Sequence, residues 1–325
     1  MRLRDQPSRG SAAAALWPLT QAIGAGLLVH RLEPQDDAIG ALFGLLDDHR
    51  ESSRRGRGGY LPLPGQRPLY YDDNAWVGLD QVQAALVGLA GAEGSTRDWI
   101  SAARATLDVV MAGRDPDGTV RWNDLAGSPS NTCATAPAIE LALRLALVAP
   151  EGPGRDELVA FAADADAALT RRLRRDDALY ADHVTVAGEV DHSLWSYNQG
   201  TPVGADVLWS RLTGEGTRLE RASATASAAL AHFGPAALWA QPPAFVAVFV
   251  RNLFALHAVA PVPGLVEAVD GYLERAWTVG RDPGSGRFGG AGMGRYDAGG
   301  VIDHAALVQM LALRGWSATS WPDLC

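Results

Sequence analysis

Most of the chain consists of segments in which apolar residues recur every three to four positions, the spacing of one face of an α-helix. The predicted helices are 12–30, 38–46, 74–92, 98–112, 132–148, 155–174, 199–212, 217–232, 243–259, 263–279 and 301–313. Alternating polar and apolar residues, typical of strands, are confined to short stretches such as 119–122 and 184–186. The sequence therefore predicts an all-α protein.

The loops between these helices alternate in length and composition. Some are short and made of Gly, Pro, Ser and Thr, as at 91–98 and 149–155, whereas the others are long and rich in aromatic, amide and charged residues. Because short loops join antiparallel neighbours, all the long loops should lie at one end of the molecule. This pattern predicts an α/α toroid with an inner and an outer ring of helices, and an open α-solenoid is the alternative.

We expect one catalytic domain over residues 1–325, with loose tails at 1–10 and 316–325. The C-terminal part looks short for a full last hairpin. Either the segment 38–46 closes the barrel or the last hairpin is incomplete.

Charge and cysteine content exclude several classes of protein. The formal net charge is −9, which argues against a nucleic-acid or anionic-membrane binder. No stretch is long and apolar enough to cross a membrane. Cys133 and Cys325 form neither a disulfide framework nor a zinc-binding spacing, and we interpret Cys133 as a small buried apolar residue. No metal or organic cofactor is expected, and the oligomeric state is not predicted.

The N-terminal segment has two interpretations. Arg2 and Arg4 precede a partly apolar run, as in a secretory signal. However, the polar sequence HRLE follows at 30–33 in place of a small-residue cleavage site. We interpret the run as a first amphipathic helix, which favours a cytoplasmic protein, and secretion is the alternative.

The stretch 70–76 reads YYDDNAW and places two carboxylates side by side between aromatic residues. Two carboxyl groups that share a site push one pKa upwards, so one can be protonated while the other is ionised. A glycosidase needs this division between an acid and a nucleophile or base. Alternatively, Asp72 and Asp73 cap the next helix, for which one Asp would be enough. This stretch alone supports the two interpretations equally.

Further motifs offer groups that could bind a sugar. The stretch 193–200 reads SLWSYNQG, and its Tyr, Asn and Gln side chains can exchange hydrogen bonds with hydroxyls. The alternative is that Asn198 caps a helix. Arg251 lies in an apolar run and needs a partner if it is buried. Trp122, near Asn131, is by itself more often a core residue than a sugar platform.

The order of these motifs, from YYDDNAW to the apolar run 245–253, resembles glycoside hydrolase family 76, which contains endo-acting α-1,6-mannanases and related enzymes. The resemblance extends over nearly the whole chain, to Leu313. It implies an (α/α)6 barrel and retaining hydrolysis of an oligo- or polysaccharide, with Asp72 as nucleophile and Asp73 as acid/base. The expected substrate-binding residues are Tyr71, Trp76, Trp122, Asn131, Tyr197, Asn198, Gln199, Phe245 and Arg251.

Neighbours in a helix do not point at the same place. We therefore expect Asp72 and Asp73 on an irregular turn just before the helix 74–92. The chain departs from the family pattern at Val77, Thr135 and Val246, so the substrate could be another α-linked glycan.

Two other functions stay open. One is a sugar epimerase or isomerase on the same toroid, using histidines as acid and base. Its candidate residues are His183, His192, His257 and His304. The other is a carbohydrate-binding relative that has lost catalysis.

Overall fold

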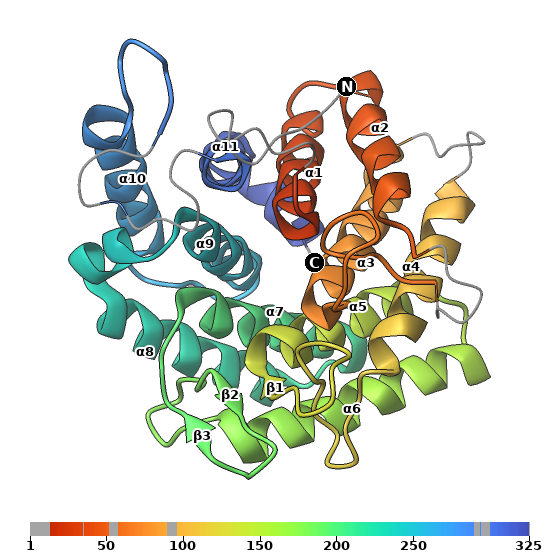
Figure 1. Cartoon of the computed structure of the whole chain (residues 1–325). Helices are drawn as coiled ribbons and strands as arrows, with labels where there is room; N and C mark the ends of the chain where they lie inside the picture. Colours follow the sequence, from red (N-terminus) through yellow and green to blue (C-terminus); the bar gives the residue numbers. More distant parts are fainter. Residues whose placement is uncertain are drawn as a thin grey trace.

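The computed structural model describes residues 14–34, 36–51, 58–89, 96–288, 293 and 300–324 (Figure 1). The predicted all-α fold is confirmed, and each expected helix is present. The helices are α1 (Leu16–His30), α2 (Asp36–Gly44), η1 (Leu45–His49), α3 (Tyr71–Leu86), α4 (Thr96–Met111), α5 (Thr132–Val148), α6 (Pro153–Leu173), α7 (Ser196–Thr213), α8 (Gly216–Ala240), α9 (Pro243–His257), α10 (Leu265–Arg275), η2 (Ala276–Gly280), α11 (Val301–Gly315) and η3 (Ala318–Leu324).

The helices form two concentric layers. In the inner ring α1, α3, α5, α7, α9 and α11 each pack against the next, and α11 packs against α1 (Figure 1). The even-numbered helices pack on the outside. The ring is therefore closed, which excludes the open solenoid. The closure is made by α1 and α11, not by the segment 38–46, and η3 packs against inner helices such as α9.

Sequence pattern explains which helices lie inside. Every residue of α5 from Thr132 to Ala146 is buried, as expected for a helix that is apolar nearly all round. In contrast, the outer helix α6 buries one stripe, which includes Leu158, Phe161, Ala165 and Leu169. Inner helices approach closely where a glycine allows it. A Cβ at Gly200 of α7 would lie 2.7 Å from the Cα of Phe249 in α9.

The segment after α11 is packed, although we expected a loose tail at 316–325. The indole N–H of Trp316 donates to the Leu28 carbonyl, and that of Trp321 donates to the Leu313 carbonyl. Arg144 donates to the carbonyl of Leu324. Burial of two large aromatic rings explains why this end is ordered. Residues 1–10 and Cys325 lie outside the described residues.

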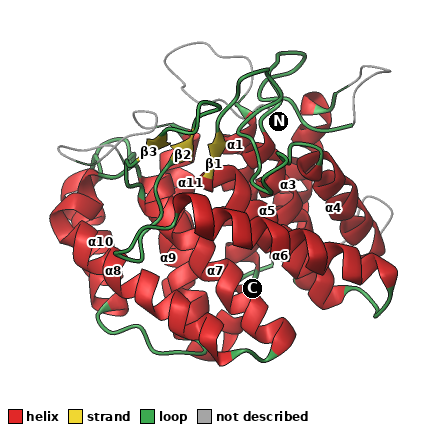
Figure 2. Cartoon of the chain, turned by 90° about the horizontal axis from the view of Figure 1, so that it is seen from below, coloured by secondary structure: helices red, strands yellow, loops and turns green. Residues whose placement is uncertain are grey.

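Three short strands lie among the long loops at one end of the helices (Figure 2). They are β1 (Ser130–Asn131), β2 (His183–Val184) and β3 (Val190–Asp191), paired antiparallel in the order β1-β2-β3. The register places Asn131 opposite His183 and His183 opposite Asp191. Within the described part of the chain, no helix combines the length and apolar character that a membrane span requires.

Candidate active site

A cavity of about 850 Å³ opens where the inner helices begin. This volume lies within the range of about 300 to 1,000 Å³ that is usual for ligand sites. Its wall is formed by Ala15, Trp17, Pro18, Pro62, Tyr70, Asp72, Asp73, Trp76, Trp122, Pro129, Asn131, Cys133, Asp182, His183, Trp195, Tyr197, Pro242 and Phe245.

Asp72 and Asp73 both border the cavity from the first turn of α3, which begins at Tyr71. The expectation of an irregular turn before the helix is therefore wrong. At a helix N-terminus there is no preceding turn to cover the side chains. Two successive side chains can therefore both reach the end of the helix. The free N–H groups there also favour negative charge. Indeed, the Asp72 carboxylate accepts a hydrogen bond from the backbone N–H of Asp73.

Two side chains donate hydrogen bonds to one oxygen of Asp72. The indole Nε1 of Trp122 lies 3.1 Å from Oδ2, and the Sγ of Cys133 lies 3.6 Å from the same atom. Burial raises the pKa of Asp72 to about 6, and these hydrogen bonds oppose the rise. Cys133 is buried as expected, but it belongs to the wall of the site and contacts an ionisable group.

Asp73 lies in a different environment from its neighbour. Burial raises its pKa well above the usual value, and the negative charge of Asp72 raises it further. When two carboxyl groups interact this closely, the first proton lost comes from the group whose anion is better stabilised. Because Asp72 accepts the hydrogen bonds, we assign the charge to Asp72 and the retained proton to Asp73.

Two groups of aromatic rings line the same cavity as this pair. In one group, the ring centroids of Tyr70 and Trp122 are 5.0 Å apart. In the other, the ring centroid of Phe245 lies 4.1 Å from that of Tyr197 and 5.6 Å from that of Trp195. Flat apolar rings of this kind match the C–H faces of a sugar.

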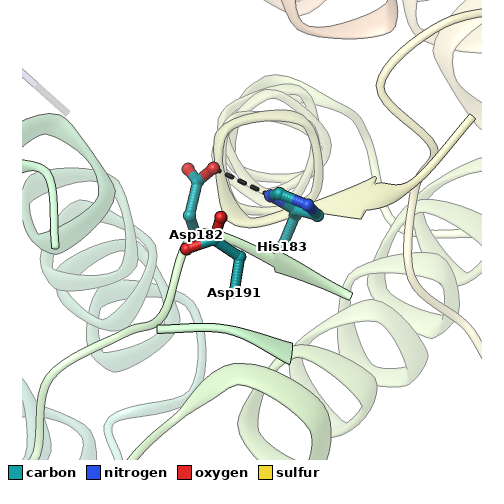
Figure 3. A group of neighbouring side chains, drawn as sticks. All are labelled: Asp182, His183 and Asp191. Carbon is teal, nitrogen blue, oxygen red and sulfur yellow. Dashed lines mark hydrogen bonds and ion pairs between the residues drawn. The ribbon is translucent and has the colours of Figure 1, made fainter. Parts of the chain in front are cut away.

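A third carboxylate, Asp182, borders the cavity beside His183 (Figure 3). Asp182 Oδ1 accepts a hydrogen bond of 2.9 Å from the amide of Asn198, and its Oδ2 lies 2.9 Å from Nδ1 of His183. Asp182, His183 and Asp191 offer ligand atoms within 4.8 Å of one another, an arrangement that could hold a metal ion. Both oxygens of Asp182 already have partners in the protein, so the cluster is satisfied without an ion.

The structure separates the predicted substrate-binding residues into two groups. The cavity wall includes Trp76, Trp122, Asn131, Tyr197 and Phe245. The other predicted residues, Tyr71, Asn198, Gln199 and Arg251, do not line it, and their part in substrate binding stays a prediction.

These other residues support the site from behind. Tyr71 packs in the core, with its ring against Gly113. Asn198 is fully buried and holds Asp182, whereas Gln199 hydrogen-bonds both backbone groups of Tyr180. Arg251 lies two turns into α9, with its guanidinium 5.2 Å from the ring centroid of Trp76. Tyr71, Asn198 and Gln199 lie in the first turn of their helices, but on faces other than the one that lines the cavity, whereas Arg251 lies deeper along α9.

The departures from the family pattern also lie behind the cavity wall. Val77 and Val246 are completely buried in the apolar core. The hydroxyl of Thr135 accepts a hydrogen bond of 3.0 Å from the backbone N–H of Val120. None of these three residues lines the cavity, so they do not contact a ligand there directly.

Trp17 and Asp182 of the wall escaped sequence analysis, and His183 was named only for the epimerase alternative. One signal could have found part of the set, because each of five inner helices contributes the second or third residue of its first turn. These residues are Trp17, Asp72, Cys133, Tyr197 and Phe245. Asp182 and His183 come from a long loop, for which helix periodicity gives no position.

Comparison with known proteins agrees with this geometry. The sequence model of glycosyl hydrolase family 76 matches residues 44–249. An α-mannanase of this family from Bacteroides thetaiotaomicron has a similar structure, with a TM-score of 0.80 and 18% identity over 95% of this chain and 88% of that chain. The α-1,6-mannanase of Salegentibacter sp. HEL1_6 gives a TM-score of 0.76 with 17% identity over 94% of this chain and 91% of that one.

Other similar proteins are more varied. Dfg5 from Chaetomium thermophilum, solved in complex with glucosamine, gives a TM-score of 0.76 with 15% identity over 97% of this chain and 85% of that chain. The Meiotically up-regulated gene 191 protein of Schizosaccharomyces pombe is 27% identical over 154 residues, which are 44% of this chain. The match spans about a third (34%) of that relative's length.

The family match covers more than half of the chain, and the observed (α/α)6 toroid is the fold of the solved family members. The chain therefore belongs to glycosyl hydrolase family 76 and is a glycoside hydrolase.

Proposed function

We propose that this hydrolase is a retaining α-glycosidase that cleaves α-1,6-linked mannosides, with Asp72 as nucleophile and Asp73 as acid/base. The observation that carries the proposal is the pair of adjacent, partly buried carboxyls with unequal environments in one aromatic cavity. In the Salegentibacter α-1,6-mannanase, variants with two neighbouring aspartates replaced are inactive and bind α-1,6-mannotriose or α-1,6-mannotetrose.

The assigned protonation states suit the first half of a retaining reaction. Ionised Asp72 attacks the anomeric carbon while protonated Asp73 gives its proton to the glycosidic oxygen, so the leaving sugar departs as an alcohol. The C–O bond to the leaving group breaks, and an ester bond from Asp72 to the sugar forms.

In the second half Asp73, now ionised, takes a proton from water. The water oxygen attacks the anomeric carbon and releases Asp72 as a carboxylate. The hydrogen bonds from Trp122 and Cys133 favour this carboxylate as a leaving group.

Two alternatives are less well supported. An epimerase would need an acid and a base, but His183 is the one histidine among the four candidates that lines the cavity. A purely carbohydrate-binding protein would not need two carboxyls of unequal acidity. The Dfg5 complex with glucosamine makes an amino sugar the second candidate ligand for this cavity.

The proposal is tested by incubating the protein with α-1,6-, α-1,3- and α-1,2-linked manno-oligosaccharides and following the anomer released by NMR. We expect cleavage of the α-1,6 linkage with initial release of the α-anomer. Initial release of the β-anomer would refute the retaining mechanism, and binding without cleavage of any glycoside would favour the carbohydrate-binding alternative.

The roles of the two aspartates are tested with Asp73→Asn and a mannoside whose leaving group needs little protonation. The first step should proceed and the second should stall, so that a glycosyl-enzyme accumulates and increases the mass of the intact protein. The matched Asp72→Asn protein should show no such increase. A trapped ester in Asp72→Asn, or its absence in Asp73→Asn, would show that the roles are assigned wrongly.

A further inference from the structure

We infer that Cys133 is a positioning residue for the hydrolase. Its thiol, supported by the hydroxyl of Tyr197, donates a hydrogen bond that orients the Asp72 carboxylate and keeps it ionised for attack. The inference rests on the nucleophilic role proposed for Asp72.

The three groups form a row across three neighbouring inner helices. Asp72, Cys133 and Tyr197 are each the second residue of their helix, α3, α5 and α7. The Sγ of Cys133 lies 3.6 Å from Oδ2 of Asp72, and the Cys133 side chain also hydrogen-bonds the side chain of Tyr197. Cys133 is 4% exposed, so water cannot easily replace either contact.

Chemistry determines the direction of these hydrogen bonds. An ionised carboxylate can only accept, so the S–H must donate to Asp72, and the Tyr197 O–H then donates to sulfur. Burial raises the pKa of the Cys133 thiol well above its usual value, and the charges of Asp72 and Asp182 raise it further. The thiol therefore remains protonated, and it acts as a donor rather than as a nucleophile.

The surroundings of Asp72 make this donor important. Titratable groups from several elements act on this row. Tyr70 and Asp73 lie at the start of α3, and Cys133 and Tyr197 lie in α5 and α7. Asp182 comes from the loop before β2, where it is paired with His183. Among the described residues, the largest causes that shift the pKa of Asp72 are burial and hydrogen bonds rather than the charge of a cation. Stabilisation of the carboxylate thus depends on the donors Trp122, Cys133 and the backbone.

A titration of the Asp72 carboxyl tests the inference directly. The carboxyl ¹³C shift would be followed against pH in protein labelled at aspartate, with Asp72→Asn used for assignment. In Cys133→Ala we expect the pKa of Asp72 to rise by about 0.5 to 1 unit, because one hydrogen bond to the charged form is lost. Tyr197→Phe should raise it in the same direction by less. The acidic limb of kcat/KM should move upwards with the titration, while KM changes little.

Cys133→Val is the matched control for packing, because it refills the space left by Ala without providing a donor. A donor role predicts that Val raises the pKa as much as Ala does, even if Val restores the Tm. The inference would be overturned if Asp72 titrated as in the wild type in Cys133→Val, or if its titration were unchanged in Cys133→Ala.

The S–H stretching band gives an independent measurement, because it lies in a region of the infrared spectrum free of other protein bands. In a Cys325→Ser background, the band of Cys133 should move to higher frequency when Asp72→Asn removes the charged acceptor. A band that does not move would contradict the hydrogen bond. Neither this measurement nor the titration needs turnover, so a protein that cleaves no glycoside would refute the proposed function and still report on Cys133.

Discussion

Carboxyl groups occur in two layers of this ring, where they have different neighbours. Asp72 and Asp73 border the cavity, whereas Asp80 of α3 and Glu140 of α5 lie deeper inside the ring. Asp80 is eight residues beyond Asp72, which is about 12 Å along a helix. Burial raises the pKa of all four groups and is the largest cause for each.

The difference lies in what opposes this rise. Asp80 and Glu140 face Arg144 and Arg251, whose positive charges lower their pKa values. At the cavity, hydrogen-bond donors lower the pKa of Asp72, and the two causes given by the described residues for Asp73 both raise its pKa. Burial is therefore common to both layers, and the facing cations set the deeper carboxyls apart. Under the proposed function the cavity layer keeps a proton available for transfer, whereas in the deeper layer the arginines offset part of the cost of burying carboxyl groups.

The largest effect should come from the same substitution made in each layer. Asp72→Asn removes the proposed nucleophile and should lower kcat/KM on an α-mannoside by about 10⁴-fold or more. Asp80→Asn is the matched control on the same helix, and it should keep activity within about tenfold per folded molecule, because Asp80 does not line the cavity. Kinetics with circular dichroism of both proteins would check this. Equal losses in the two folded variants would remove the functional distinction between the layers.

The next effect tests the cations of the deeper layer. Arg251→Met leaves Asp80 and Glu140 with one facing guanidinium fewer and should lower the free energy of unfolding by about 3 to 5 kcal/mol. Denaturant unfolding measures this loss. Adding Asp80→Asn to the same protein should restore part of it, because the carboxyl left without its cation is then neutral. A loss below about 1 kcal/mol would contradict a charge-balancing role for Arg251.

The pH dependence of stability should reveal Glu140. Its pKa is raised from 4.5 to about 7 in the folded protein, so between these pH values the native state binds more protons than the unfolded state. The contribution of protonated Glu140 to the free energy of unfolding is fully present below pH 4.5 and is lost as the pH rises through 7. Glu140→Gln should remove this dependence, so that the free-energy difference between variant and wild type changes by about 2 kcal/mol from pH 5 to pH 8. Parallel stability curves would show that Glu140 does not titrate in this window.

The smallest effect concerns the other donor to Asp72. Trp122→Phe keeps a ring facing Tyr70 but removes the indole N–H that contacts Oδ2. The pKa of Asp72 should then rise, and kcat/KM at about pH 5 should fall by about tenfold, while the loss at neutral pH is smaller. Full pH-rate profiles of both proteins provide the measurement. A uniform loss at every pH would indicate that Trp122 acts through sugar contact alone.

Local pattern predicted the helices and their alternation well. The predicted helix 132–148 coincides with α5, because its apolar periodicity and its flanking residues agree. The start of α3 was placed three residues late, since Tyr71, Asp72 and Asp73 lack the apolar period that marks the rest of the helix. The predicted helix 217–232 ends before Gly234-Pro235, where α8 kinks at a glycine with φ 51° and continues to Ala240. Glycine and proline disfavour helix, so the predicted helix stopped before them. In the structure, packing against the ring keeps the second half of α8 helical.

The sequence by itself therefore determined the fold class, the common end of the long loops and the aspartate pair, because each depends on residues close together in the chain. Tertiary structure alone decided that α1 and α11 close the ring, that Asp182 enters the cavity and that the Cys133 thiol contacts Asp72. Cys133 and Asp72 are 61 residues apart, and their contact arises only when α3 and α5 pack side by side. The helical period specifies which face a residue occupies, but only the packing of distant helices specifies what that face meets.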